Sequence, residues 1–364
     1  MNNQSNIQRP IRKITRKVLL KHIARPVYIG GDANVSIQSM TTTDTLDYQA
    51  TMDQIIQLAD AGCDIVRVAV ESTTQLDNAK LLALNSPVPL VADIQFDYKL
   101  AIACCDLGYS KIRFNPGNVG GIHRVREIAA AAKSNGTVIR VGANSGSVEK
   151  SFLQESNGDQ AIALCNSAQA SVRVLQECGI EDIVVSLKCS NPSLNLASNR
   201  LLATLMDYPL HVGVTESGVP DIGLAKSYAG IGSLLLDGIG DTVRISLTAD
   251  PVQEVLAAKR LLNALDLRQY AEVISCPTCS RCKYDMISFA NFVQDKVRNV
   301  DKDIKLAVMG CVVNGPGEAK HADLGIAGGD GKAVVFEHGQ IVYTATDKQA
   351  EEYFVNRLDA LING

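Results

Sequence analysis

The sequence contains no apolar run that approaches the roughly 20 residues a membrane-spanning helix needs. It also lacks an excess of positive charge, because 35 lysines and arginines face 39 aspartates and glutamates, for a net charge of −4. Such a chain has no bulk attraction to nucleic acids or anionic membranes, and we expect neither as a partner. Its 364 residues, 46% of them hydrophobic, suffice for two ordinary domains or for one barrel with a smaller partner.

The first 25 residues lack the continuous apolar stretch of a signal peptide. They are instead basic, with Arg9, Arg12, Lys13, Arg16, Lys17, Lys21 and Arg25, and we interpret them as a solvated arm. Without an export signal, the ten cysteines are expected to be reduced thiols or metal ligands rather than disulfides. We therefore predict a cytoplasmic protein.

Eight short runs rich in β-branched residues recur along the chain, separated by stretches with the apolar spacing of helices. They cover 35–39, 65–70, 89–94, 111–115, 137–143, 182–188, 210–216 and 242–248. Eight β–α units within about 250 residues are typical of a (β/α)8 TIM barrel, which we assign to residues 1–266. An open doubly wound sheet is the alternative, but no dinucleotide-binding fingerprint opens the first unit.

Polar residues stand in or just after the C-terminal half of almost every predicted strand. They are Arg67, Asp93, Arg113 with Asn115, Arg140 with Asn144, Lys188, Thr215 with Glu216, and Arg244 with Ser246. In a barrel these residues converge on one mouth, where active sites of this fold lie. Five cations at one mouth of an acidic protein predict a phosphorylated ligand. Pairing with Asp64, Glu71 and Asp93 is the alternative, but these carboxylates are too few for five cations.

Residues 267–364 are predicted to form a small α+β domain. After a short connection over 267–275 we expect a helix over 286–297, a strand over 305–309 and a strand–turn–strand over 333–344 that turns at His338 and Gly339. The domain opens with Cys276, Cys279 and Cys282 at intervals of three, and Cys311 follows 29 residues later. From spacing alone, all four cysteines are candidate ligands, and an iron–sulfur cluster is favoured over zinc.

Two motifs of this domain, 276-CPTCSR-281 and 310-GCVVNGPGE-318, carry a resemblance that extends over nearly the whole chain. Together with 30-GGDANVSIQSMTTTDT-45, 111-KIRFNPGN-118, 211-HVGVTESG-218 and 238-GIGDTVRISLTADP-251, they resemble the bacterial 4-hydroxy-3-methylbut-2-enyl diphosphate synthases of the non-mevalonate isoprenoid pathway. The resemblance implies a [4Fe–4S] cluster held by Cys276, Cys279, Cys311 and Glu318. Cys282 lies outside the family pattern and is expected to be a bystander.

The resemblance also implies a reaction, in which 2-C-methyl-D-erythritol 2,4-cyclodiphosphate is opened and dehydrated by two electrons to (E)-4-hydroxy-3-methylbut-2-enyl diphosphate. The implied substrate ligands are Arg67, Arg113, Asn115, Arg140, Asn144, Lys188, Thr215 and Ser246. Glu216 is the expected acid–base residue and Glu318 the displaceable carboxylate ligand. Flavodoxin or ferredoxin is the implied electron donor, since no flavin or nicotinamide motif is present, and a head-to-tail homodimer is the implied assembly.

Two other functions remain open at this point. One is a non-redox transferase or lyase that acts on a phosphorylated substrate and carries a structural zinc ion in its second domain. The other is an iron–sulfur sensor, which would need no cations at the barrel mouth.

Overall fold

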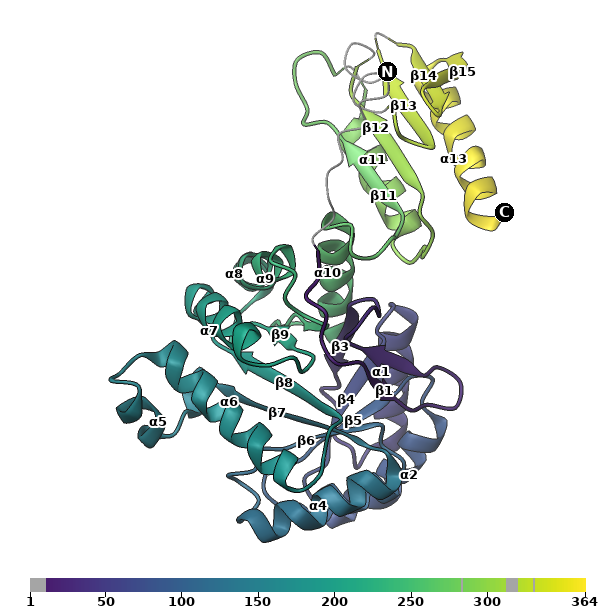
Figure 1. Cartoon of the computed structure of the whole chain (residues 1–364). Helices are drawn as coiled ribbons and strands as arrows, with labels where there is room; N and C mark the ends of the chain where they lie inside the picture. Colours follow the sequence, from purple (N-terminus) through teal and green to yellow (C-terminus); the bar gives the residue numbers. More distant parts are fainter. Residues whose placement is uncertain (1–10, 283, 312–319, 330) are drawn as a thin grey trace. The chain divides into compact units, whose positions relative to one another are not determined.

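The computed structural model describes residues 11–282, 284–311, 320–329 and 331–364. The chain divides into two compact units, Met1–Arg268 and Gln269–Gly364, which are coloured from purple to green and from green to yellow in Figure 1. Among the described residues no helix combines the length and the apolar character needed to cross a bilayer.

The first unit is built on a parallel eight-stranded sheet in the order β8-β7-β6-β5-β4-β3-β10-β9. The strands are β3 (Ser36–Met40), β4 (Ile65–Ala69), β5 (Leu90–Asp93), β6 (Lys111–Arg113), β7 (Val138–Asn144), β8 (Ile183–Lys188), β9 (His211–Gly213) and β10 (Thr242–Arg244). A bridge between Val185 and Leu210 joins the two edge strands, with the Val185 amide donating to the Pro209 carbonyl at 2.9 Å. The TIM barrel and its eight strands are therefore confirmed.

Helices follow the strands and cover the outside of the barrel (Figure 1). They are α1 (Tyr48–Asp60), α2 (Leu76–Asn85), α3 (Tyr98–Asp106), α4 (Ile122–Asn135), α5 (Lys150–Glu155), α6 (Gln160–Glu177), α7 (Pro192–Leu205), α8 (Pro220–Ser227), α9 (Ser233–Leu236) and α10 (Pro251–Ala264). Several begin at an aspartate or asparagine whose side chain accepts an amide of the first turn, as Asp47 does from Ala50 at 3.0 Å. Such caps satisfy amides that have no partner inside the helix.

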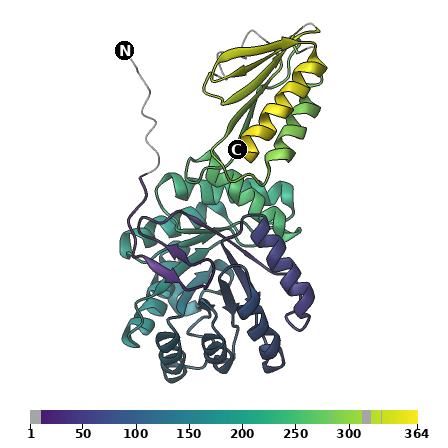
Figure 2. The same ribbon diagram turned by 90° about the vertical axis from the view of Figure 1, so that its right-hand side faces the viewer.

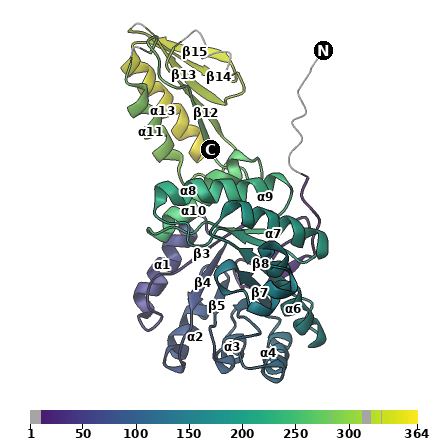
Figure 3. The ribbon, with the colours of Figure 1, turned by 90° about the vertical axis from the view of Figure 1, so that its left-hand side faces the viewer.

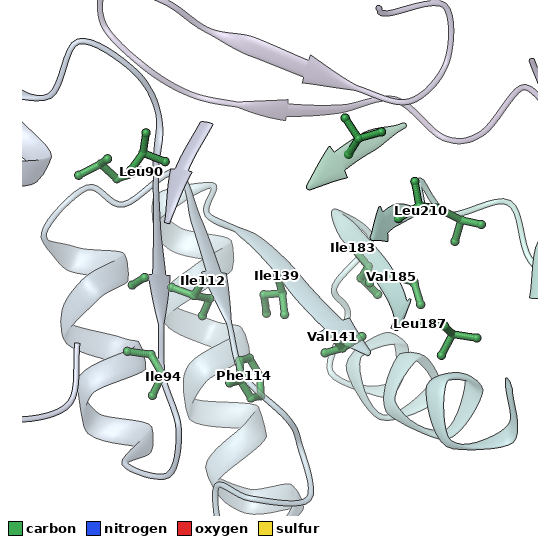
Figure 4. Packing of buried hydrophobic residues seen from close by; sticks show 14 of the residues in the cluster. Leu90, Ile94, Ile112, Phe114, Ile139, Val141, Ile183, Val185, Leu187 and Leu210 are labelled. Atoms are coloured by element: carbon green, nitrogen blue, oxygen red, sulfur yellow. The ribbon is translucent and has the colours of Figure 1, made fainter. Parts of the chain in front are cut away.

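The barrel strands alternate between two environments. Ile112, Ile139 and Val185 are fully buried in the hydrophobic core formed with the helices (Figure 4). The residues between them in the strands, such as Lys111 and Arg140, have the opposite parity. Because successive side chains of a strand point to opposite faces, the helix-covered face receives the apolar residues, and the polar residues lie on the inner face toward the C-terminal ends of the strands.

Residues 18–29 form a hairpin of β1 (Val18–Leu20) and β2 (Val27–Ile29) rather than a solvated arm. Its buried side chains pack with Ile65, Val91, Val138 and Val184, which lie toward the N-terminal ends of the barrel strands. The interpretation as a solvated arm is thus wrong for residues 11–25, and residues 1–10 lie outside the described part. This segment is ordered because apolar residues lie among its cations and can be buried, and because cations pair with carboxylates. Arg12, for example, lies 2.7 Å from Asp241.

The second unit is a five-stranded sheet in the order β11-β12-β13-β14-β15. The strands are β11 (Glu272–Ser275), β12 (Lys305–Met309), β13 (Leu324–Gly328), β14 (Ala333–Glu337) and β15 (Gln340–Ala345), the first three parallel and the last three antiparallel. Figures 2 and 3 show α11 (Met286–Val297) and α13 (Asp347–Asn363) side by side on one face. There Phe289 and Phe354 meet edge to face at 5.5 Å between centroids.

The predicted helix 286–297, the strand 305–309 and the hairpin that turns at His338 and Gly339 are confirmed. Three elements were missed, namely β11, β13 and α13. The segment 267–275, expected to be a connection, contains β11 because its residues pair in parallel with β12. A four-residue strand that depends on a partner 33 residues away in sequence has little local signal.

Candidate active site

Five cationic side chains lie at the C-terminal end of the barrel, on strands β4, β6, β7, β8 and β10. They are Arg67, Arg113, Arg140, Lys188 and Arg244. Asp93 at the end of β5 lies between two of them, because Arg113 Nη1 donates to its Oδ1 at 3.0 Å and Arg67 Nε is 3.9 Å from its Oδ2. Burial alone would raise the pKa of Asp93, but Arg67, Arg113 and Arg140 hold this pKa below its usual value.

Positive charge exceeds negative charge at this mouth. Besides Asp93, the carboxylate that pairs with the five cations among the described residues is Glu254, which lies 3.6 Å from Arg244 Nε. Four arginines and one lysine thus face two carboxylates. Asp64, considered above as a partner, instead pairs with Arg25 and Arg268 at the N-terminal end of β4. Burial and the neighbouring cations lower the pKa of Lys188 well below its usual value, so a polyanion would relieve repulsion here.

Arg140 is prepared for such a ligand on one side only. Its Nε and Nη2 donate to Ser186 Oγ at 3.2 and 2.9 Å, which fixes the plane of the guanidinium group. Its Nη1 is buried and has no hydrogen-bond partner within the described part of the chain. A buried donor without a partner is unfavourable, so this nitrogen favours an acceptor brought by a ligand.

Sequence reasoning missed two polar residues that lie beneath these cations. Lys111 at the start of β6 is fully buried, and its Nζ donates to Gln38 Oε1 at 3.2 Å. His211 at the start of β9 is also fully buried, and neither ring nitrogen finds a partner among the described residues. The pKa of His211 is lowered well below its usual value, mainly by burial and further by the positive charges of Arg140 and Lys188. The imidazole is therefore neutral. A signal existed, since Lys111 and Arg113 share one face of β6.

The neutral residues predicted at the mouth follow the same strand ends. Asn144 pairs with Lys188 in the register of β7 and β8, and Asn115 lies two residues beyond β6. The Asn115 Oδ1 accepts the amide of Gly117 at 3.1 Å. The backbone amide of Thr215 donates to the Cys189 carbonyl at 3.2 Å. These residues thus stand at or just beyond the C-terminal ends of barrel strands.

Glu216 stands in an unusual backbone conformation at the end of strand β9. Its φ of 52° places a residue with a side chain in the left-handed region. The neighbouring Ser217 donates its hydroxyl to the Ser246 carbonyl, which ties this turn to the end of β10. Glu216 itself is exposed to solvent, and residues with a left-handed backbone cluster at functional sites.

The cysteines of the second unit gather at one edge of its sheet. Cys276 follows β11 and Cys311 comes two residues after β12, and these strands are parallel neighbours. The Gly310 amide donates to Cys276 Sγ at 3.2 Å, while a Cβ built on Gly310 would lie 3.1 Å from Cys282 Sγ. Cys279 is exposed, and hydrogen bonds from Arg281 lower the pKa of its thiol.

Thiol donors at adjacent strand ends fit an iron–sulfur cluster by their chemistry, since thiolates are the ligands such clusters take. In the part of the chain that the structure describes, no group of three or more His, Cys, Asp and Glu side chains is close enough to hold one metal ion. The expected fourth ligand, Glu318, lies outside the described residues. All ten cysteines lie inside them, and each is a free thiol.

Comparison with known proteins bears on both units. The GcpE TIM-barrel domain model matches residues 15–259 and the GcpE protein C-terminal domain model matches residues 272–360. The chain is 46% identical to a protein of Ruminiclostridium cellulolyticum, over 92% of this chain and 95% of the relative. It is 45% identical to one of Caldanaerobacter subterraneus over 97% and 98%, and 46% identical to one of Geobacter sulfurreducens over 92% and 96%. All three relatives are named 4-hydroxy-3-methylbut-2-en-1-yl diphosphate synthase (flavodoxin). The resemblance stated from the motifs is thereby confirmed, and the chain belongs to the GcpE family.

Proposed function

We propose that this protein is an iron–sulfur oxidoreductase that converts 2-C-methyl-D-erythritol 2,4-cyclodiphosphate into (E)-4-hydroxy-3-methylbut-2-enyl diphosphate with two electrons. The observation that carries this proposal is the barrel mouth, where five cations meet two carboxylates. A cyclic diphosphate brings the negative charge that these cations lack. The names of the relatives, each a synthase of this diphosphate, support the same reaction.

The barrel residues would bind and orient the substrate. Arg67, Arg113, Arg140 and Lys188 would hold the two phosphates, and the unpartnered Nη1 of Arg140 is the nitrogen best prepared for a phosphate oxygen. Asn115, Asn144, Thr215 and Ser246 would supply neutral hydrogen bonds to the remaining oxygens. Because ring opening releases a phosphate oxyanion, cations already in place would stabilise the transition state. Arg244, held near Glu254, would support the array.

Glu216 would serve as the acid–base residue for the departing hydroxyl group. It is exposed, and its left-handed backbone projects the carboxylate from a turn between β9 and α8. None of the described salt bridges of the mouth cations engages it. A general acid needs to reach the leaving oxygen directly or through one water molecule.

The second unit would hold a [4Fe–4S] cluster through Cys276, Cys279, Cys311 and Glu318. When bound, such a cluster supplies electrons one at a time. The donor would be flavodoxin, as the relatives' names state for those proteins, or a ferredoxin. Cys282 would remain outside the ligand set although it lies beside Gly310.

We further propose a head-to-tail homodimer in the cytoplasm, in which the cluster of one subunit serves the barrel of its partner. Ten cysteines without a disulfide bond among them suit a reducing compartment. Mixing Arg140→Met with Cys311→Ser protein tests the dimer. If subunits exchange at random, about a quarter of wild-type activity should return through mixed dimers. No recovery after proven subunit exchange would contradict the head-to-tail arrangement.

The test of the reaction is an anaerobic assay with the cyclodiphosphate and reduced flavodoxin, in which the product is identified by mass spectrometry. Metal analysis of the same sample gives about four irons per chain if the cluster is present. Product formation by the iron-containing protein is the expected outcome. A colourless protein with one zinc ion per chain, inactive after anaerobic reconstitution, would contradict the proposal and favour a non-redox enzyme.

A further inference from the structure

Two arginines of the barrel mouth converge on a methionine sulfur. Met40 is the last residue of β3, the strand between β4 and β10. Its Sδ accepts from Arg67 Nε at 3.0 Å and from Arg67 Nη2 at 2.8 Å, and Arg244 Nη1 lies 3.8 Å away on the other side. Met40 is also the register partner of Arg67, so the backbone fixes this contact.

This choice of acceptor is unusual because carboxylates lie nearby. Asp93 Oδ2 is 3.9 Å from Arg67 Nε, and Glu254 Oε2 is 3.6 Å from Arg244 Nε. Neither distance is a hydrogen bond. A thioether is only a weak acceptor, whereas a guanidinium group normally takes a carboxylate or phosphate in a two-pronged contact. The sulfur therefore occupies the position where a stronger acceptor would bind.

We propose that Met40 is a positioning residue, which holds the guanidinium groups of Arg67 and Arg244 in the substrate-free barrel and yields them to the oxygens of the diphosphate. This inference rests on the proposed function, since it assigns the incoming acceptor to the substrate. A neutral, weak acceptor keeps the two arginines oriented without competing with a dianion. A carboxylate at this position would compete, because it would neutralise both arginines before the substrate arrives.

Removal of the Met40 sulfur would free Arg67 to pair with Asp93. Without the sulfur, Arg67 can rotate toward Asp93 and close the gap of 3.9 Å. The resulting ion pair would withdraw Arg67 from the mouth, where Arg113 already donates to the same carboxylate at 3.0 Å. Substrate would then have to break a charge-assisted hydrogen bond rather than a contact to sulfur.

Three substitutions separate the acceptor from the volume of the side chain. Met40→Leu keeps a similar volume and removes the acceptor, Met40→Gln keeps length and supplies a neutral oxygen, and Met40→Glu adds a charge. Met52→Leu is the matched control, because Met52 lies on α1 in the hydrophobic core, where such exchanges are well tolerated. Folding of each variant is checked by thermal unfolding.

The primary readout is binding of inorganic pyrophosphate to the anaerobic holoprotein by calorimetry, followed by kcat and KM for the cyclodiphosphate. Met40→Leu should weaken pyrophosphate binding about tenfold and raise KM by a similar factor with little change in kcat. Met40→Gln should bind within about threefold of wild type, and Met40→Glu at least about a hundredfold more weakly. Met52→Leu should leave all three quantities unchanged.

The result that would overturn the inference is wild-type binding by Met40→Leu, or equal losses in the Leu and Gln variants while Met52→Leu is normal. If the Leu variant does not fold, the comparison of Gln with Glu decides, and equal binding by these two would overturn it. Absence of turnover in the wild type, with the ranking of pyrophosphate binding intact, would refute the proposed reaction and leave the role of Met40 supported.

Discussion

Asp93 and Arg113 form an ion pair of 3.0 Å across the ends of the neighbouring strands β5 and β6, and they are direct partners in the strand register. Both side chains are largely withdrawn from solvent, with 7% of the Asp93 side chain exposed. The same carboxylate draws Arg67 toward it. A single acidic residue thus lies between two of the arginines that we propose bind the substrate.

Substitution Asp93→Asn should therefore affect both stability and substrate binding. Loss of one partner of a buried pair is expected to lower the free energy of unfolding by about 3 kcal/mol, as measured by urea unfolding. KM should also change, because Arg113 loses its charged hydrogen-bond partner and Arg67 loses a neighbouring negative charge. Asp64→Asn provides the control, since Asp64 pairs with Arg25 and Arg268 at the other end of β4. It should lower stability without changing KM, and a KM effect as large as that of Asp93→Asn would contradict this account.

The buried lysine Lys111 should make stability depend on pH. In the folded protein its pKa is lowered well below the ordinary 10.5, mainly by burial and further by the positive charges of Arg140 and Arg67. In the unfolded chain the same lysine keeps its proton up to that ordinary pKa. Between the two pKa values the unfolded state binds more protons, so the free energy of unfolding rises with pH, by at most about 1.4 kcal/mol per pH unit for this group. Below both pKa values its contribution to the slope vanishes.

Lys111→Met should flatten this rise. Urea unfolding at a series of pH values measures the slope for both proteins, and the exposed lysine Lys80 on α2 supplies the control substitution Lys80→Met. We expect the control to retain the wild-type slope. An unchanged slope in Lys111→Met would show that the amine is charged in the folded protein.

Glu216→Gln should impair the chemical step rather than binding. Loss of a general acid typically lowers kcat roughly a hundredfold or more. KM should change little, because we propose that other residues bind the phosphates. Glu71→Gln is a suitable control, since Glu71 is an exposed carboxylate beyond the end of β4. If Glu216→Gln keeps full kcat at every pH, the proton is delivered by another group.

Cys311 and Cys282 should differ in their effect on the cluster. Cys311→Ala should remove the broad visible absorption at about 400 nm that is expected of an iron–sulfur protein. It should also lower the iron content. Cys282→Ala should leave both unchanged in the anaerobic protein, because Cys282 lies outside the proposed ligand set. Loss of iron in Cys282→Ala would make this thiol a ligand.

The barrel and its mouth could be predicted because their signals are local. Each strand is a short β-branched run, and Arg113, Arg140 and Lys188 interrupt apolar runs where a cation requires an anionic partner. Lys111 and His211 escaped notice because they stand at strand starts, where a polar residue normally marks an exposed end. Their burial depends on the closure of the whole barrel.

Residues that act through distant partners were the hardest to predict. Asp64 seemed available to the mouth, but it pairs with Arg25 and Arg268, which are 39 and 204 residues away in sequence. Glu254 lies on a helix, where an acidic residue is normally expected to be exposed to solvent. In the structure it accepts hydrogen bonds from Ser39 at 3.0 Å and from the Leu247 amide at 2.9 Å. Met40 reads as an ordinary apolar residue, and only its contact with Arg67 suggests more.

The measurement that tests the central claim most directly is the number of electrons consumed for each molecule of product. Reduced flavodoxin of known concentration is added stepwise under anaerobic conditions to the protein and excess cyclodiphosphate. The product is quantified in the same samples. The account predicts two electrons for each molecule of 4-hydroxy-3-methylbut-2-enyl diphosphate, and loss of this consumption in Arg140→Met. Product formed without electron consumption, or electrons consumed without opening of the cyclodiphosphate, would contradict a reductive enzyme whose substrate binds at the barrel mouth.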